Sequence, residues 1–393
     1  MLVLTGAALI DGTGAPPVRG RAVAIEDGRI ARVVDEASLP RGERIDLEGG
    51  TLLPGLINCH VHLCLGAEAD PVTPMRAEPL ALTAIRAARR ARETVEAGVT
   101  TVRDLGGREY AEMAVKRAVD EGLVPGPRIL AAGKPICMTG GHGHWVAREA
   151  DGPDDVRRAV REQLKAGADV VKIIATGGVM TPGMEAGAPQ LTAAEIAAAI
   201  EEARKAGRRT AAHAQGTAGI ADCVAAGITT IEHGIYLTAE IVARMAADGI
   251  YLVPTLNAPC AIAAGGIAAG IPAFMVRKSE IVTESHLASF RMALAAGVAI
   301  AAGSDAGTPL NRHGSLVPEL ALMVAHGMTP LQAIRSATQV AAEALGIGEE
   351  TGRIAPGLSA DLVAIAGDPA QKIEALDDVR LVVARGRIAR RSL

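Results

Sequence analysis

The sequence predicts an α/β fold in which a (β/α)8 TIM barrel carries a small β-sandwich domain formed by both termini. Residues 55–355 alternate eight times between a β-branched strand and an alanine-rich helix, and we assign them to the barrel. Residues 1–54 and 356–393 contain short strands separated by glycine turns, and we assign them to the sandwich. Eight units over this length favour a closed barrel over an open doubly wound sheet, and no GxGxxG loop follows the first predicted strand.

The two ends of the chain have the same β-rich texture. The segment "AVAIEDGRIARVV" predicts a hairpin, because Asp-Gly tolerates the positive φ of a type I′ turn. Near the C-terminus, "ADLVAIAG" and "VRLVVARGRIAR" again read as strands with a glycine turn. Both ends of the chain contain strands, whereas its middle alternates strands and helices. This pattern predicts that the two ends together form one small β domain.

The middle of the chain contains eight predicted strands, each followed by a helix. Several of these helices end in Ala-Gly or Asp-Gly just before the next strand, which fits glycine C-caps in βα units. The strands are "LPGLINCHVHL", "TTVRDL", "RILAAGKP", "DVVKIIATGG", "RTAAHAQ", "TTIEHG", "YLVPTL" and "VAIAAGSDA".

Composition excludes several classes of protein. A net charge of −4 offers no broad basic surface for nucleic acid, and 2% aromatic residues cannot form a stacking platform. The five cysteines are odd in number and form no CxxC pair, which predicts a reduced, cytoplasmic environment. The first residues lack the pattern of a secretory signal. The apolar run 252–276 is broken by prolines and glycines, so we interpret it as a strand followed by an apolar loop or flap, not a membrane span.

Five metal-ligand side chains lie at the C-terminal ends of predicted strands, where active sites of such barrels form. Residues i and i+2 share a face of a strand, so the two histidines of "CHVH" point the same way, into the barrel. One such histidine alone is more often a satisfied structural residue, but imidazoles and a carboxylate at one rim favour Zn²⁺ or a similar divalent ion. These residues are His60, His62, His213, His233 and Asp305.

Lys172 lies in the fourth predicted strand, at the same rim. A lysine ammonium beside metal cations would be repelled, and burying it is costly. From the residues alone it is either a lysine at a strand end or one paired with a carboxylate. Arg103 in "TTVRDL" is expected to pair with Asp104 or another internal carboxylate.

Five segments in this order, "GLINCHVHL", "VVKIIATGG", "AAHAQG", "TIEHG" and "GSDAG", resemble the amidohydrolase superfamily. The resemblance is to its imidazolonepropionase-like branch, which includes Xaa-Pro dipeptidase-like metal-dependent hydrolases, and it covers essentially the whole chain. It implies that His60, His62 and Asp305 bind one metal and that His213 and His233 bind a second. It further implies that Lys172, carboxylated on its side-chain nitrogen, bridges two Zn²⁺ ions.

The resemblance also implies a mechanism. A metal-bound water becomes the nucleophile, and Asp305 acts as general acid and base. The developing oxyanion needs a partner, and His142 in "MTGGHGHW" matches the GGH motif of the family; a loop-packing role is the alternative. His144 could line the pocket, and Tyr236 either polarises the carbonyl or packs at the rim. Arg148 and Arg312 are candidates for binding a substrate carboxylate, and His313, in the same loop as Arg312, either lines the pocket or caps a helix.

The resulting expectation is a cytoplasmic binuclear-metal amidohydrolase that cleaves the amide C–N bond of a dipeptide or N-acyl amino acid. The alternatives are a cyclic-amide hydrolase like imidazolonepropionase, or a carbamate or xenobiotic amide hydrolase such as one for N-aroyl phenylalanine toxins. A metal-free scaffold is a third, remote alternative. The expected partner is a small molecule, neither nucleic acid nor membrane, and the apolar flap together with the resemblance suggests a homo-oligomer.

Overall fold

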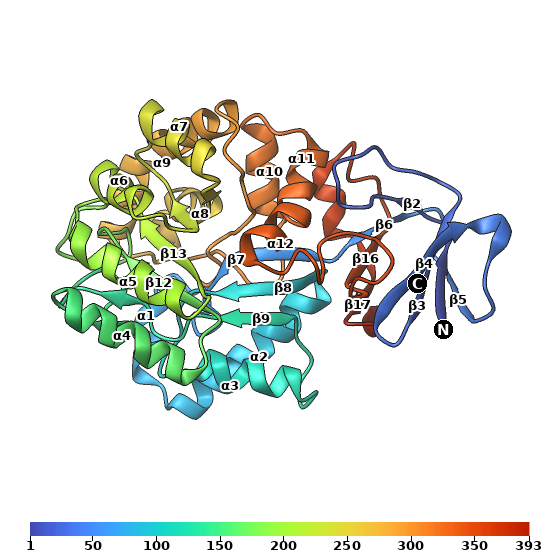
Figure 1. Cartoon of the computed structure of the whole chain (residues 1–393), viewed down its shortest axis with the longest axis horizontal. Helices are drawn as coiled ribbons and strands as arrows, with labels where there is room; N and C mark the ends of the chain where they lie inside the picture. Colours follow the sequence, from blue (N-terminus) through green and yellow to red (C-terminus); the bar gives the residue numbers. More distant parts are fainter. Residues whose placement is uncertain (393) are drawn as a thin grey trace.

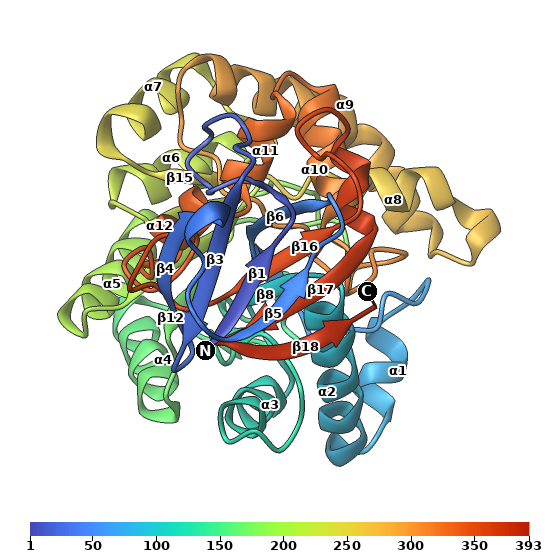
Figure 2. The ribbon, with the colours of Figure 1, turned by 90° about the vertical axis from the view of Figure 1, so that its right-hand side faces the viewer.

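The computed structural model describes residues 1–392 as a mixed α/β fold (Figure 1). Parallel strands and helices from the middle of the chain lie together at one end of the molecule, and sheets from both termini lie at the other. Figure 2 looks onto these terminal sheets, with helices arranged around them.

The parallel strands carry the site. They form a three-stranded sheet, β7-β8-β9, and a six-stranded sheet, β11-β10-β12-β13-β14-β15. The strands are β7 (Leu56–Val61), β8 (Val99–Asp104), β9 (Arg128–Ala131), β10 (Ile136–Cys137), β11 (Arg148–Glu149), β12 (Val170–Ile174), β13 (Arg209–Ala214), β14 (Thr230–His233) and β15 (Tyr251–Val253).

The eighth predicted strand, 298–306, pairs through bridges instead of a continuous ladder. On one side Ala301 N donates to Leu252 O of β15 (2.9 Å). On the other side Cys59 N of β7 donates to Ala302 O (2.9 Å), and Asp305 N donates to His60 O (2.8 Å). The segment therefore connects the last and the first of the parallel strands.

Helices follow most of these strands, and their ends show the caps that the sequence suggests. Thr192 and Glu195 form a capping box at the start of α5, and α4, α7 and α12 end at glycines with positive φ. The α-helices are α1 (Val72–Ala77), α2 (Leu80–Glu96), α3 (Ala111–Asp120), α4 (Pro153–Ala166), α5 (Ala193–Lys205), α6 (Thr217–Ala225), α7 (Ala239–Asp248), α8 (Asn257–Gly265), α9 (Ala273–Ala295), α10 (Val317–Ala325), α11 (Pro330–Ser336) and α12 (Gln339–Leu345), and short 3-10 turns are η1 (Glu36–Ser38), η2 (Ile267–Ala269) and η3 (Ile373–Asp377).

The predicted apolar flap within 252–276 is helical, which corrects the expectation of a loop. It contains α8, η2 and the first turn of α9, whose apolar side chains pack on one another. The prolines lie at or near the starts of these helices, where a missing N–H costs no hydrogen bond. Among residues 1–392, the helices are all too short or too polar to cross a bilayer.

The terminal sheets have the orders β4-β3-β1-β5 and β18-β17-β16-β6-β2, and the second combines strands from both ends of the chain. The predicted Asp-Gly hairpin turn is present, with positive φ at both Asp27 and Gly28. These strands are β1 (Leu2–Thr5), β2 (Ala8–Leu9), β3 (Arg21–Glu26), β4 (Arg29–Asp35), β5 (Glu43–Asp46), β6 (Thr51–Pro54), β16 (Leu362–Ile365), β17 (Val379–Ala384) and β18 (Arg387–Arg391).

Candidate metal centre and active site

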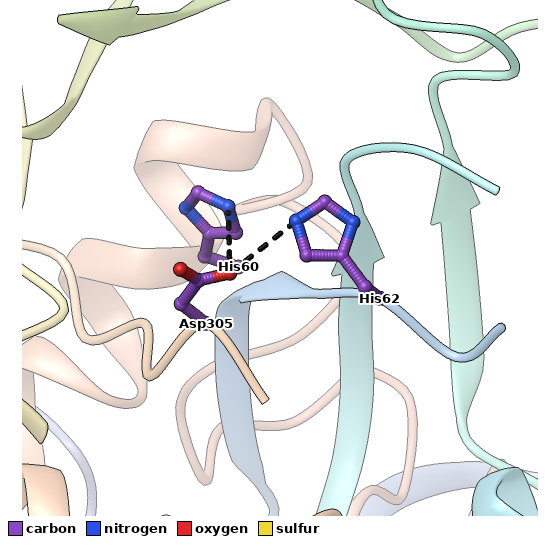
Figure 3. Close-up of side chains that lie close together, drawn as sticks. All are labelled: His60, His62 and Asp305. Atoms are coloured by element: carbon purple, nitrogen blue, oxygen red, sulfur yellow. Dashed lines mark ion pairs between the residues drawn. The ribbon is translucent and has the colours of Figure 1, made fainter. Parts of the chain in front are cut away.

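His60 near the end of β7, His62 just after that strand and Asp305 converge at the C-terminal end of the strands (Figure 3). His60 Nε2 lies 3.4 Å from Asp305 Oδ1, and His62 Nε2 lies 3.3 Å from the same oxygen. One ligand atom from each of the three lies within 4.8 Å of the others. Asp305 has a positive φ of 59°, a conformation that costs energy for a residue with a side chain and is common at functional sites.

A second group of predicted residues adjoins the first. His213 and His233 end the neighbouring strands β13 and β14, and their ring centroids are 4.5 Å apart. The His233 ring is also 5.2 Å from that of His60. Lys172 on β12 lines the same pocket, and its buried Nζ has no hydrogen-bond partner within residues 1–392. The structure thus brings all six predicted ligand residues to one pocket.

Hydrogen bonds to the far sides of two imidazoles fix which nitrogen faces the pocket. His62 Nδ1 lies 2.9 Å from the carbonyl oxygen of Gly106, which can only accept, so Nδ1 carries the proton. His233 Nδ1 lies 2.7 Å from Thr255 Oγ1, whose own hydroxyl donates to a backbone carbonyl, so Nδ1 is again the donor. Each ring therefore presents an Nε2 lone pair, the atom that a metal binds.

Burial keeps three of the histidines uncharged at neutral pH. It lowers the pKa of His60 to about 4 and holds the pKa values of His213 and His233 well below their ordinary value. Burial also lowers the pKa of Lys172 to about 8. The exception is His62, where the nearby Asp305 carboxylate outweighs burial and raises the pKa of the imidazole, so a bound cation would take the place of a shared proton. The donor set and the unpartnered lysine nitrogen therefore fit a divalent metal site.

A buried ionic chain supports His60 from behind. Glu232 Oε2 lies 2.8 Å from His60 Nδ1, and Glu232 Oε1 accepts a 2.7 Å hydrogen bond from Arg103 Nη2. Burial alone would raise the pKa of Glu232, but Arg103 and His60 outweigh it and lower the pKa to about 2. Arg103 thus pairs with Glu232 and not with Asp104, which instead accepts the backbone N–H of Leu63.

Sequence reasoning missed Glu232 because it precedes His233, and alternation would place the two on opposite faces. The positive φ of 73° at His233 breaks that alternation, so both side chains approach the site. A charged residue inside the apolar strand "TTIEH" was the available signal. His286 was also missed; it lies in the middle of α9, and its Nε2 is 2.7 Å from the carbonyl oxygen of Pro254.

The loop after β10 brings His142 to the pocket, as predicted. Its ring centroid is 4.4 Å from that of His213, and its Nδ1 lies 2.8 Å from Thr181 Oγ1. The Thr181 hydroxyl accepts a hydrogen bond from Gly143 N, so it can donate its proton to His142 Nδ1. Burial lowers the pKa of His142 to about 3, so the ring is neutral and Nε2 carries its proton.

The other predicted substrate residues lie outside the pocket lining. Arg148 is held by Asp155 and Glu162, each at 2.9 Å, so its charge is already neutralised. Arg312 is exposed, and His313 Nε2 contacts the carbonyl oxygen of Leu65 (2.9 Å). The remaining two are His144, whose Nδ1 contacts Gly141 O, and Tyr236, which is half-buried against the apolar side chains beside α8.

Apolar side chains form most of the pocket wall above the six predicted ligands. The pocket encloses about 840 Å³, including the solvent space at its mouth. Within residues 1–392, Lys172 is the only lysine or arginine in its lining. The apolar wall is made by Leu65, Leu105, Pro135, Trp145, Val146, Ile174, Val179, Met180, Ile235, Ala258, Pro259 and Ile262.

Residues 51–389 match the model of the amidohydrolase family. The chain belongs to the amidohydrolase family. This confirms the resemblance seen in the strand-end motifs, and an amidohydrolase acts on amide bonds.

Two characterised relatives align with nearly the whole of this amidohydrolase. Ochratoxinase of Aspergillus niger is 32% identical over 95% of this chain and 83% of its own. Imidazolonepropionase of Acidiphilium cryptum is 28% identical over 98% of this chain and 94% of its own. Among solved structures, a Xaa-Pro dipeptidase with methionine bound in the active site has a TM-score of 0.92 at 32% identity, covering 98% of this chain and 99% of that one.

Proposed function

We propose that this amidohydrolase cleaves the amide C–N bond of a dipeptide or N-acyl amino acid, with a bulky apolar group of the substrate in the pocket. The observation that carries the proposal is the convergence of six ligand-type side chains at the floor of an apolar pocket. His60, His62 and Asp305 would hold one Zn²⁺, His213 and His233 a second, and Lys172 would join them as a carbamate. Bound Zn²⁺ supplies Lewis acidity and an acidified water.

Asp305 is suited to move the proton. Burial alone would raise the pKa of its carboxyl, but His60 and His62 outweigh burial and hold that pKa below its usual range. The carboxylate is therefore ionised at neutral pH and can accept a proton from the attacking water. It then delivers this proton to the leaving nitrogen, which an amine needs in order to depart.

His142 is suited to stabilise the charge that develops on the carbonyl oxygen. With Thr181 donating to Nδ1, the neutral ring presents Nε2–H to the pocket as a fixed donor. Such a preorganised donor in a site that excludes water contributes more than it would in bulk solvent. The apolar wall, which includes Trp145 and Ile262, excludes that water.

A second candidate is a substrate without a free carboxylate: a neutral cyclic amide, carbamate or xenobiotic amide, as distinct from the N-aroyl phenylalanine toxins, which are themselves N-acyl amino acids. The specific observation in its favour is the lining of the pocket, where Arg148 and Arg312 contribute no cation. A free carboxylate inside an apolar pocket would lose its hydration without gaining a charged partner. The two candidates therefore differ in whether the substrate's carboxylate helps or hinders binding.

The test compares N-benzoyl-phenylalanine with N-benzoyl-phenethylamine, which lacks only the carboxylate, on zinc-loaded enzyme. Faster cleavage of the acid supports the N-acyl amino acid function, and faster cleavage of the neutral amide supports the second candidate.

Activity should disappear on chelation and return with Zn²⁺, and His60→Asn should abolish turnover in a folded protein. Lys172→Ala that is fully active without added short carboxylic acids would refute the bridge. Purified protein without bound metal, indifferent to chelators, would refute the metal-dependent mechanism.

We further propose that the parallel strands close into a (β/α)8 barrel over 55–355 and that 1–54 with 356–393 form a β-sandwich domain. The hydrogen bonds of 298–306 to both β15 and β7 support closure. The antiparallel pairing of β6 with β16, from opposite ends of the chain, supports a shared terminal domain.

A further inference from the structure

A second cavity lies at the opposite end of the strands from the candidate site. Residues at the starts of β9 and β13 line it, together with α3, the turn after α12 and Arg385 between β17 and β18. Its volume, including the solvent space at its mouth, is about 890 Å³, close to that of the candidate site. The arrowheads of β8 and β9 point away from β16 and β17, so this cavity lies where the parallel strands begin, next to the terminal sheets (Figure 1).

Positive charge exceeds negative charge around this cavity. Three of the five cations in its lining have carboxylate partners: Lys116 pairs with Asp169, Arg128 with Asp361 and Arg385 with Asp120. The other two, Arg208 and Arg209, form no ion pair with any residue of 1–392. After internal pairing, the cavity therefore retains two positive charges.

Within residues 1–392, one guanidinium nitrogen at the cavity is buried without an acceptor, and a second guanidinium uses little of its donor capacity. Arg128 Nε is buried without a hydrogen-bond partner in the described chain. Arg209 uses only Nη1, which donates to the carbonyl oxygen of Ala344 (3.2 Å) at the end of α12. Gly346, with a φ of 78°, leaves room for the Arg209 side chain, since a Cβ there would lie 2.6 Å from Nε. A guanidinium has five donors, and leaving them unsatisfied in a partly enclosed site costs free energy.

We propose that this cavity binds a small tetrahedral dianion, inorganic phosphate or a phosphomonoester group. Two negative charges would balance the excess of Arg208 and Arg209, and phosphate oxygens match the fork of N–H donors on a guanidinium. Arg385 belongs to the terminal sheets, and Arg128 and Arg209 belong to the parallel strands. The bound dianion would therefore also hold these two parts of the chain together.

The experiment titrates inorganic phosphate into the metal-loaded enzyme, with ionic strength held constant by NaCl, and follows binding by calorimetry and by the melting temperature. We expect saturable binding and a higher melting temperature for the parent enzyme. In Arg208→Gln/Arg209→Gln, affinity for phosphate should fall roughly tenfold or more, because charge-assisted hydrogen bonds to arginine are lost. Arg208→Gln alone removes an exposed side chain and should weaken binding in a protein that folds normally.

The matched control is Arg244→Gln on α7, which removes a surface arginine remote from the cavity lining. It should bind phosphate as the parent does. The comparison among variants also separates this cavity from the metal centre, where phosphate could bind as well, because amide hydrolysis should be unchanged in all three variants. The proposal would be overturned if phosphate raised the melting temperature no more than chloride does, or if it bound the double variant as tightly as the parent. Equal or tighter binding of malonate would overturn the assignment to a tetrahedral anion.

Discussion

Arg103, Glu232 and His60 form a chain of charged and polar groups that is almost completely removed from solvent. Arg103 also donates from Nε to the carbonyl oxygen of Cys59 (2.7 Å), so it contacts β7 next to His60 as well as approaching His60 through Glu232. A buried ion pair contributes little over a well-packed apolar pair, but breaking it leaves an uncompensated charge. The contacts among Arg103, Glu232 and His60 therefore fix the orientation of His60. A substitution at Arg103 or Glu232 is expected to destabilise the protein.

Glu232→Gln should lower the free energy of unfolding by about 3–5 kcal/mol, because it leaves the Arg103 guanidinium buried without its counter-charge. Urea unfolding followed by circular dichroism measures the change. The matched control is the double variant Arg103→Met/Glu232→Leu, which removes both charges and should be more stable than Glu232→Gln alone. A Glu232→Gln variant within about 1 kcal/mol of the parent, the contribution of an exposed ion pair, would contradict this account.

Glu112 on α3 gives a stability effect that depends on pH. Both of its carboxylate oxygens are buried without a hydrogen-bond partner in residues 1–392, and burial raises its pKa well above the ordinary 4.5. Below that ordinary value the folded and unfolded states both hold the proton. As pH rises above it, only the unfolded state releases the proton, so the parent loses stability until the folded-state pKa is reached.

The glutamine side chain of the Glu112→Gln variant has no ionisable proton, so this variant should not lose stability in the same way as pH rises. We expect the difference in melting temperature, variant minus parent, to increase steadily between mildly acidic and mildly alkaline pH. Differential scanning calorimetry across that range measures it. A difference that is constant with pH would show that Glu112 ionises as easily in the folded protein as in the unfolded chain.

Among the helices, α5 shows how a local cap also connects neighbouring elements. Thr192 N donates to Glu195 Oε2 (2.7 Å), and Glu195 N donates to Thr192 Oγ1 (3.4 Å). The other oxygen of Glu195 accepts the N–H of Gly152 (2.7 Å), the N-cap residue of α4. One carboxylate therefore satisfies backbone groups at the starts of two adjacent helices.

Thr192→Ala should lower the free energy of unfolding by about 1 kcal/mol, the usual effect of removing an N-cap hydroxyl. Thr192→Ser keeps the hydroxyl and serves as the control, with stability close to that of the parent. Chemical unfolding of the three proteins under the same conditions gives the comparison. An alanine variant as stable as the serine variant would mean that Glu195 alone caps the helix.

Across the chain, the hydrophobic core joins the terminal sheets to the parallel strands. One continuous cluster contains Leu53, Val363 and Val382 from the terminal sheets together with Val61 and Val102 from β7 and β8. Separating the two parts would expose this shared apolar surface to water. The two parts are therefore expected to unfold together, although each has sheets of its own.

The single tryptophan, Trp145, lines the candidate site and reports on that end of the molecule. Its fluorescence and the far-ultraviolet circular dichroism should give the same midpoint in urea, because the shared core couples the parts. Leu53→Ala provides the comparison: it should move both midpoints together to lower urea. Two separated transitions in the parent protein would contradict a common unfolding unit.

Local sequence determined the strand–helix alternation, the Asp-Gly hairpin turn, the glycine helix ends and the set of ligand-type residues at strand ends. These depend on side-chain periodicity, on backbone freedom at glycine and on the pleat that puts His60 and His62 on one face. Because parallel strands begin and end at common edges, residues far apart in sequence could be expected at one site. The helical structure of the apolar run 252–276 could not be predicted in the same way, because a short apolar segment has the same composition in a loop as in a helix.

Only the tertiary structure decided which charges meet. Arg103 could pair with several carboxylates, and its partner Glu232 is 129 positions away. Arg148 looked available for substrate until α4 brought Asp155 and Glu162 to it. Arg208 and Arg209 have no ion-pair partner among residues 1–392 because the fold brings no described carboxylate close to them. Electrostatic partners depend on distances across the fold, and burial sets the strength of each interaction, so neither can be read from the order of residues. The sequence by itself thus determined the elements and the chemistry of the ligands, and the tertiary structure decided the pairing and burial of their charges.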